Sequence, residues 1–230
     1  MSDTSPVSLV CCDVVGAAAV DGSVLERAFV EAIATQGVVT GTAAYVKAMV
    51  QFDRARGWSP ADVIHSLFPD DEIRAQAANL AFERSFQAAA DRFGALLRPG
   101  ANDALAKLAA AGIKLCLMSS LSRPAFSLIM ERLGWWQRGD LILCADDVLR
   151  GFPWPDLVLT AILRLGVGDV RDVAVVTASE SGVLCAHRAG ARLVIGVLSD
   201  VDDGRRLRRA GATHLLADLG ELPDLLACPA

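Results

Sequence analysis

Short apolar segments alternate with longer segments of helical periodicity along most of the chain. The apolar segments are hydrophobic on both faces, which is typical of buried parallel strands: Ser8 to Cys12, Ile113 to Met118, Leu141 to Cys144, Val173 to Val176 and Leu193 to Val197. Helical patterns lie between the last four, for example Ala101 to Ala111 and Asp156 to Leu165. This order predicts an α/β fold with a doubly wound, Rossmann-like parallel sheet.

The first predicted strand is not followed by a single crossover helix. Some eighty residues separate it from the second strand, and all of them read as helices, as in "LERAFVEAIATQG" and "DEIRAQAANLAFERSFQAAADRFGALL". An insertion of this kind predicts a separate helical cap. We therefore predict a core domain of residues 1–20 and 99–230 and a helical cap domain of residues 21–98.

The composition is that of a globular protein with a large hydrophobic core. Apolar residues make up 53% of the chain, and the formal net charge is -5, which argues against nucleic acid or an anionic membrane as a partner. The N-terminus is polar, and no apolar run is long enough to span a bilayer, so we expect a cytoplasmic protein. The six cysteines show no ligand spacing and are expected to be buried free thiols.

Asp13 is the first candidate for chemistry. It follows the first apolar strand and shortly precedes Gly16, which marks a sharp turn. The carboxyl ends of parallel strands are where open α/β sheets bind ligands, so a carboxylate there can be reactive. It can equally serve the fold by accepting backbone N–H bonds in the turn, and the sequence leaves both roles open.

Several phrases together resemble a known family. They are the aspartate after strand one, the inserted helices, "RPGANDALAKLAAAGIKLCLMSS", "GFPWPDLVLTAILRLGV", "VAVVTASESGVLCAHRAGAR" and "GATHLLADLGEL". This set is similar to the haloacid dehalogenase superfamily, and within it to the phosphonatase-like hydrolases. The resemblance covers nearly the whole chain and implies a Rossmann-like core with a helical cap. Function must still be argued from the site.

The resemblance implies roles for residues at the ends of two strands. Asp13 matches the nucleophile that forms a covalent intermediate in this family. Many members carry a general acid two residues later, where this chain has Val15. Ser119 matches the hydroxyl that binds the transferring group, with Ser120 beside it, although both serines can simply cap a helix.

Two further motifs of the family are altered. The third normally supplies a basic residue before "PxPD", but here the position holds Phe152, with Arg150 two residues away. The fourth supplies carboxylates for Mg²⁺ in the loop after the fourth strand, at positions occupied here by Ala178 and Gly182. Glu180 is the one carboxylate left in that loop. We therefore expect no metal site, because Mg²⁺ needs several oxygen ligands.

The size of the electrostatic effect supports this expectation. A phosphoryl charge about 4 Å from the Asp13 carboxylate would be repelled by ~4 kcal/mol per charge pair at an effective dielectric of 20. Helix-terminus amides and Ser119 could offset only about 1 to 2 kcal/mol. The phosphonatase branch also uses a cap lysine, whose position falls on Pro60. Ordinary phosphatase or phosphonatase activity is therefore expected to be absent.

A pocket above Asp13 is expected to be lined by apolar and hydroxyl side chains. The candidate lining residues are Val15, Trp58, Ser120, Phe152, Trp154, Ala178 and Glu180. The aromatic residues among them can instead be packing residues near helix starts. The expected ligand is a small molecule in the cleft between core and cap, and the resemblance is compatible with a homodimer.

Three functions remain open. The first is a pseudoenzyme that binds a small molecule or a protein on the old scaffold. The second is a metal-independent enzyme for an uncharged substrate, in which a desolvated Asp13 acts as general base or nucleophile. The third is a residual hydrolase in which Glu180, Arg150, or Asp146 with Asp147 replace the lost groups. Because the replaced positions became apolar together, the first two are favoured.

Overall fold

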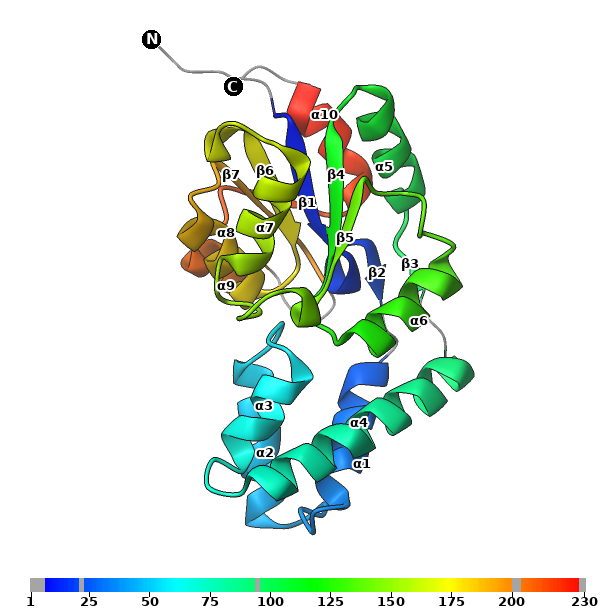
Figure 1. Cartoon of the computed structure of the whole chain (residues 1–230), viewed down its shortest axis with the longest axis vertical. Helices are drawn as coiled ribbons and strands as arrows, with labels where there is room; N and C mark the ends of the chain where they lie inside the picture. The colour runs from blue at the N-terminus through cyan, green and yellow to red at the C-terminus, as the bar shows by residue number, and fades with distance from the viewer. Residues whose placement is uncertain (1–6, 21–22, 94–95, 200–203, 228–230) are drawn as a thin grey trace.

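The computed structural model describes residues 7–20, 23–93, 96–199 and 204–227, and contains a central six-stranded parallel sheet (Figure 1). The strand order is β5-β4-β1-β6-β7-β8. The strands are β1 (Leu9–Asp13), β4 (Lys114–Met118), β5 (Leu141–Leu143), β6 (Val173–Thr177), β7 (Leu193–Val197) and β8 (His214–Leu216). The predicted α/β fold is thus confirmed.

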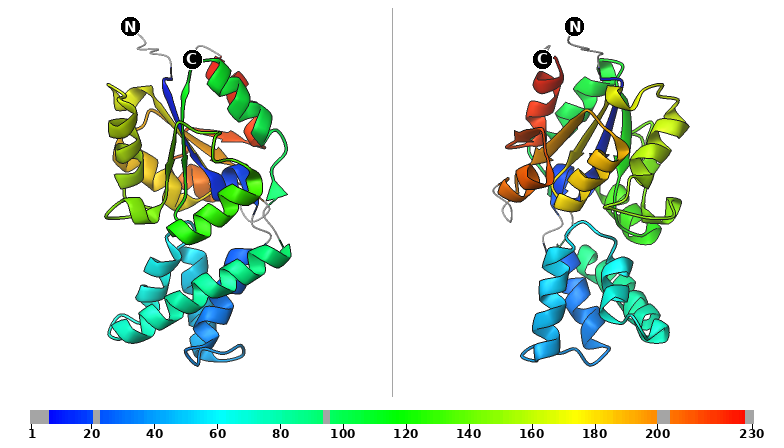
Figure 2. Two further views of the ribbon diagram at one scale, coloured as in Figure 1. Left: turned by 45° about the vertical axis from the view of Figure 1, so that its right-hand side comes forward. Right: turned by 90° about the vertical axis from the view of Figure 1, so that its left-hand side faces the viewer.

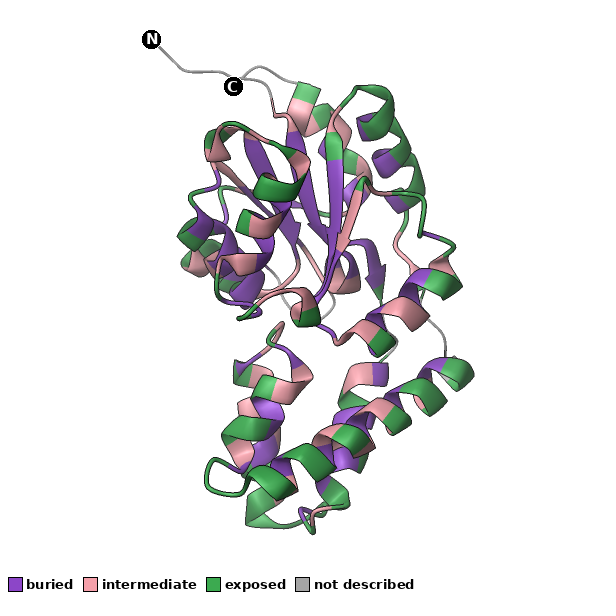
Figure 3. Cartoon of the chain, in the orientation of Figure 1, coloured by how far each residue is buried: buried purple, intermediate pink, exposed green. Residues whose placement is uncertain are grey.

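Helices cover both faces of the sheet because successive strand residues point to opposite sides. Val10 and Cys12 share one buried cluster with α5, α6 and α10, whereas Leu9 and Cys11 share another with α7, α8 and α9. Nearly all strand positions are buried (Figure 3), as the continuous apolar runs require. These helices are α5 (Ala101–Ala110), α6 (Arg123–Leu133), α7 (Asp156–Leu165), α8 (Glu180–Ala189), α9 (Arg205–Ala210) and α10 (Leu222–Ala227).

The inserted helices lie beyond the carboxyl ends of the strands (Figures 1 and 2). They are α1 (Val24–Ala34), α2 (Ala43–Arg54), α3 (Pro60–Leu67) and α4 (Glu72–Phe93). Phe29 of α1 stacks on Phe52 of α2 with ring centroids 4.5 Å apart. The helices therefore have an apolar interior of their own and cover the edge of the sheet where Asp13 lies.

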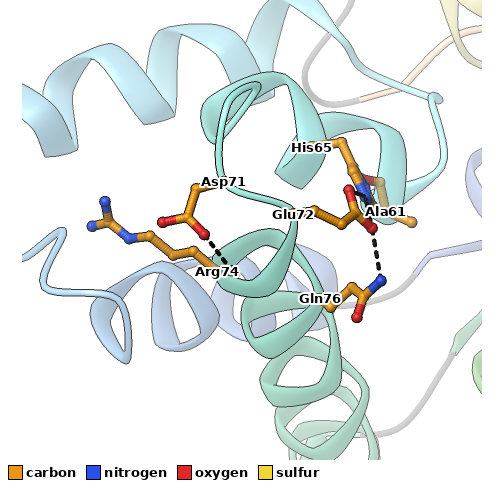
Figure 4. A network of polar contacts seen from close by, with 6 residues as sticks. All are labelled: Ala61, His65, Asp71, Glu72, Arg74 and Gln76. Carbon is orange, nitrogen blue, oxygen red and sulfur yellow. Dashed lines mark hydrogen bonds and ion pairs between the residues drawn. The ribbon is translucent and has the colours of Figure 1, made fainter.

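Polar contacts join α3 to α4 within this helical group (Figure 4). His65 Nε2 lies 3.2 Å from a carboxylate oxygen of Glu72, and Gln76 donates a 2.7 Å hydrogen bond to the same side chain. Asp71 caps α4 by accepting a 3.0 Å hydrogen bond from the Arg74 amide. These contacts fix the turn between the two helices.

Some elements differ from the predicted ones. The first strand includes Asp13 as its last residue, and β8 was not predicted because only three residues of "THLLAD" form it. The antiparallel pair of β2 (Ala19–Val20) and β3 (Leu96–Leu97), which joins the chain entering and leaving the inserted helices, was also missed because each strand has two residues. Strands this short carry no detectable periodicity.

Two expectations from the composition concern the cysteines and the absence of membrane-spanning segments. Five cysteines are buried and free, whereas Cys228 lies outside the described residues. No helix in the ranges given above is long and apolar enough to cross a membrane.

Candidate active site

Asp13 lies where the strand order changes direction. Its strand, β1, pairs with β4 on one side and with β6 on the other. The sheet continues from β4 to β5 on the first side and from β6 to β7 and β8 on the second. Open α/β sheets bind ligands at the point where the strand order reverses in this way. Asp13 is only 4% exposed, and its Oδ2 accepts a 2.9 Å hydrogen bond from Thr177 Oγ1. None of the ion pairs between described residues involves Asp13.

These surroundings change the acidity of the Asp13 carboxyl group. Burial raises its pKa to about 7, and the hydrogen bond from Thr177 opposes this rise. Because the pKa falls near neutral pH, both the protonated and the ionised forms are populated there. Such a group can give or take a proton in a reaction.

The turn after Asp13 brings two loops into contact. Gly16 has a φ of 105°, a conformation that L side chains rarely adopt, and a Cβ built on it would lie 3.2 Å from Ala178 Cβ. Val15, next to this glycine, is half-buried. Ala178 is therefore packed against the Asp13 turn with little room for a longer side chain in that direction.

Ser119 is fully buried just after β4, beside the end of β1. Its hydroxyl oxygen accepts a 3.2 Å hydrogen bond from the Leu121 amide. The next helix, α6, is capped by Ser122, not by Ser119 or the half-buried Ser120. Ser119 thus stabilises the turn after β4. The expectation that Ser119 or Ser120 caps this helix is wrong, because Ser122 is its cap.

The third motif offers no cation to Asp13. Phe152 is 1% exposed and belongs to the buried cluster on the α7 and α8 side of the sheet. Arg150 points elsewhere: it forms two hydrogen bonds to Asp156, of 3.1 and 2.9 Å, and lies 4.7 Å above the Trp154 ring. The guanidinium of Arg188 lies over the same ring at 4.7 Å. Arg150 is therefore already paired and does not replace the missing basic residue.

The fourth motif also lacks ligands for a metal ion. Glu180 is the exposed first residue of α8. A Cβ built on Gly182 would lie 2.1 Å from Thr177 Oγ1, so a carboxylate side chain cannot fit there without displacing Thr177. Within the described ranges, no three His, Cys, Asp or Glu side chains lie close enough to hold a metal ion.

Hydroxyl groups occupy this loop instead. Thr177, Ser179 and Ser181 alternate in "VVTASESG", and their oxygens follow one another at 3.3 Å intervals. We call these three side chains the hydroxyl series. These hydroxyl groups were not predicted as part of the site, because the family pattern places carboxylates in this loop. The signal was present as three hydroxyl residues at alternate positions directly after a buried strand.

The cap reaches the core at the hydroxyl series. Ser181 Oγ donates a 2.8 Å hydrogen bond to the carbonyl oxygen of Arg56, in the loop between α2 and α3. Gly57 has a φ of 82° and packs so closely that a Cβ there would lie 2.3 Å from Ser181 Oγ. This loop therefore lies directly on the end of the sheet next to Asp13.

A cavity of about 360 Å³ lies between cap and core beside this contact. Three of the predicted lining residues, Trp58, Phe152 and Trp154, contribute to it. Its lining also includes Asp62 and His65 from the cap and Asp146 and Arg150 from the core. The remaining predicted residues do not line it, namely Asp13, Val15, Ser119, Ser120, Ala178 and Glu180.

Comparison with known families and proteins gives the wider context of this site. The family described as haloacid dehalogenase-like hydrolase matches residues 34–196. A phosphorylated carbohydrates phosphatase from Thermotoga maritima is 33% identical over 126 residues, which are 54% of this chain and 58% of that protein. A phosphonoacetaldehyde hydrolase from Pseudomonas fluorescens is 30% identical over 95 residues, which are 41% of this chain and 34% of that protein.

Both matches cover less than two thirds of the relatives' own length. The fold is similar over a longer stretch. A phosphonoacetaldehyde hydrolase like protein from Oleispira antarctica superposes with a TM-score of 0.81 at 19% identity, covering 97% of this chain and 92% of that chain. The family match begins at Ala34, the last residue of α1, and so does not include the strand that carries Asp13.

Proposed function

The chain belongs to the family of haloacid dehalogenase-like hydrolases, and from this premise we propose that it has lost Mg²⁺-dependent phosphoryl transfer. In its place, the chain binds or transforms an uncharged small molecule in the cleft between core and cap, near Asp13. The observation that carries this proposal is the environment of Asp13, a buried carboxyl group held by one hydroxyl and paired with no cation.

Electrostatics support an uncharged ligand. An anionic phosphate close to ionised Asp13 would be repelled by ~4 kcal/mol per charge pair at an effective dielectric of 20. The cavity between cap and core, which Asp13 does not line, has Asp62 and Asp146 in its lining, and the positive charge of Arg150 is already balanced by Asp156. An uncharged ligand meets neither this repulsion nor the cost of burying a charge.

The residues present also do not fit a Mg²⁺ ion. Mg²⁺ requires near-octahedral oxygen coordination, usually with one or two carboxylates. Within the described strands β1 and β6, Asp13 is the only carboxylate, and Glu180 after β6 is exposed. Ala178 offers no ligand, and position 182 has no room for one. Thr177 Oγ1 already donates its hydrogen to Asp13. The proposed chemistry therefore uses no metal.

In the enzymatic version of the proposal, Asp13 works as a general base or as a nucleophile. The Thr177 hydroxyl donates to Oδ2, and in this proposal Oδ1 reacts with a substrate. Burial keeps water away, which raises the basicity of the ionised form compared with an exposed carboxylate. In the pseudoenzyme version, the same cleft binds a ligand and no bond is broken. Both versions share the site and differ only in turnover.

The residual hydrolase remains the alternative, and the contacts of its candidate groups argue against it. Asp147 pairs with Arg123 and accepts a 2.7 Å hydrogen bond from the Cys144 amide. Asp146 accepts a 2.7 Å hydrogen bond from the Arg123 amide. Arg150 is bound to Asp156, and Glu180 is exposed. Each group that would replace a lost catalytic residue already has another place in the fold.

Thermal denaturation with and without Mg²⁺ tests the metal-independent proposal. If the site bound Mg²⁺ with a Kd near 1 mM, then 10 mM Mg²⁺ would stabilise the native state by about 1.4 kcal/mol through binding linkage. For a chain of this size, that is a rise in Tm of roughly 3 to 6 °C. We expect no such rise and no decrease on adding EDTA.

The matched variants are Asp13→Ala and Glu180→Ala. A Mg²⁺-dependent rise that either substitution abolishes would show a rebuilt metal site. The residual hydrolase would then become the better proposal.

A further inference from the structure

A continuous row of oxygen atoms connects Asp13 to the cap. Thr177 Oγ1 lies 2.9 Å from Asp13 Oδ2, and the hydroxyl series continues through Ser179 and Ser181 at 3.3 Å steps. The row ends at the carbonyl oxygen of Arg56, 2.8 Å from Ser181 Oγ. It therefore has four links between neighbouring oxygens, with an acceptor at the cap end.

The number of hydrogens in this row depends on the charge of Asp13. Each hydroxyl can donate one hydrogen, so Thr177, Ser179 and Ser181 supply three for the four links. When Asp13 is ionised, one link has two oxygens and no hydrogen between them. When Asp13 carries a proton on Oδ2, every link is filled and every hydrogen bond points toward Arg56.

The remaining contacts of the hydroxyl series allow this fully directed arrangement. Thr177 Oγ1 also accepts from the Ser179 amide at 3.2 Å, and Ser179 Oγ also accepts from the Gly182 amide at 3.1 Å. With one further hydrogen bond accepted from the preceding group, Thr177 and Ser179 use both lone pairs and Ser181 uses one, and each hydroxyl donates once. No hydroxyl exceeds its capacity.

We infer that the protonation state of Asp13 controls how firmly the cap loop Ala55 to Ser59 docks on the core, and that the hydroxyl series transmits this state. A protonated Asp13 completes the row and holds the loop down. An ionised Asp13 draws the Thr177 hydrogen to itself, so one of the two links among Thr177, Ser179 and Ser181 has no hydrogen. Ser181 still donates to Arg56, but its own side chain is held less firmly, and this loosens the docked loop. Ser179 and Ser181 are thus positioning residues that couple the site to cap opening.

The loop has further contacts with the core that keep it in register. Gly57 packs against the side chains of Ser179 and Ser181 without room for a Cβ. At the rim, Arg206 of α9 lies 3.2 Å from Asp53, which also pairs with Arg56 at 2.7 Å. These ion pairs are about half exposed and weak, and the hydrogen bonds from Arg56 and Arg206 hold the pKa of Asp53 below its ordinary value.

Other titratable groups near the row are few. Cys12 and Cys185 lie near Asp13, and burial raises the pKa of both thiols, that of Cys185 to about 12, so they stay neutral. In the cap, the hydrogen bond to the Ala61 carbonyl and the nearby Glu72 raise the pKa of His65. His65 and Asp62 lie on α3, and His65 is the group whose titration must be separated from that of Asp13.

Amide hydrogen exchange of residues 55–59 in the full chain tests the inference. After correction for intrinsic exchange rates, protection in the wild type should fall roughly 2- to 12-fold between pH 5.5 and 8.5, the effect of one hydrogen bond. In Asp13→Asn the amide donates to Thr177 at every pH, so protection should stay high throughout. In Ser181→Ala the last link is missing, so protection should be low throughout.

Two control variants separate this row from other effects. Ser59→Ala removes a nearby serine that caps α3 but is outside the row, and His65→Gln removes the α3 imidazole whose pKa is raised by the Ala61 carbonyl and Glu72. Both should keep the wild-type pH dependence. The inference would be overturned if the pH dependence of protection were absent in the wild type, lost in His65→Gln or retained in Asp13→Asn.

A second measurement uses the reciprocity of the coupling. If a complete row favours protonated Asp13, then Ser181→Ala should lower the midpoint of Asp13 titration by a few tenths to about one pH unit. An unchanged midpoint would contradict the coupling even if the variant exchanged faster. Neither measurement needs a ligand or turnover. A negative result in either would therefore contradict the coupling without contradicting the proposed function, and a failed activity test would leave the coupling unaffected.

Discussion

Asp13→Asn is expected to raise the free energy of unfolding by about 4 kcal/mol at pH 8.5 and to leave it nearly unchanged at pH 4. The folded pKa of Asp13 is about 7 and the unfolded value is 3.8. The native state therefore holds this proton more tightly, and its stabilising effect is complete below the unfolded pKa. It is lost as the pH rises through the folded pKa, by about 1.4 kcal/mol per pH unit over roughly three units. Asparagine has no charge to bury and avoids this loss.

Urea denaturation of both proteins at pH 4, 6, 7 and 8.5 measures this difference. Glu180→Gln is the matched control, because it removes an exposed carboxylate from the same loop, and should change the unfolding free energy by less than about 0.5 kcal/mol at every pH. An Asp13→Asn effect of equal size at pH 4 and 8.5 would show that Asp13 is not a carboxyl group of raised pKa.

The second large effect concerns turnover. With 10 mM Mg²⁺, the protein is expected to hydrolyse p-nitrophenyl phosphate and phosphonoacetaldehyde at well below about 1 per second, the lower end of typical enzyme rates. The reason is the joint absence of a cation beside Asp13, of metal ligands at positions 178 and 182, and of an acid at Val15. Steady-state product assays measure it.

Asp13→Asn serves as the internal reference for that assay. Any residual rate should be the same in the variant, because it would come from contamination or from groups other than Asp13. A rate above about 1 per second that the substitution abolishes would return the chain to the ordinary hydrolases of its family.

Much of the fold could be predicted from the sequence because buried parallel strands leave a strong signal. The runs around Leu9, Val173 and Leu193 are apolar on both faces, and the structure has strands at each of them. Helices such as α7 were predicted at their observed bounds, since "PWP" precedes the helix and Gly166 ends it. The short strands β2, β3 and β8 could not be predicted, because their pairing depends on distant segments.

The site was harder to predict. Asp13, Phe152 and Ala178 were identified as candidates from the family pattern. Such a pattern shows whether an expected residue is present or absent, but it does not show which other side chains occupy the site. The alternate hydroxyl residues are visible in the sequence, but their contact with Arg56 depends on how the cap loop lies on the core, which no local sequence signal records. The position of Gly57 was missed for the same reason, because its closeness to Ser181 arises only in the folded chain.

Family membership and the state of the site therefore give different information. The relatives include phosphatases, and the match to the family covers residues 34–196. The fold depends on the packing of buried apolar side chains on both faces of the sheet. Chemistry depends instead on the few side chains around Asp13, so family membership alone does not assign it.

The most direct test of a metal-free, protonatable Asp13 is its own titration. The ¹³C NMR signal of the Asp13 carboxyl carbon, assigned by its loss in Asp13→Asn, can be followed from pH 3 to 9 with and without 10 mM Mg²⁺. We predict a midpoint near 7 in both series. A midpoint near the ordinary value of 3.8, or one that Mg²⁺ lowers by about a pH unit or more, would contradict the account.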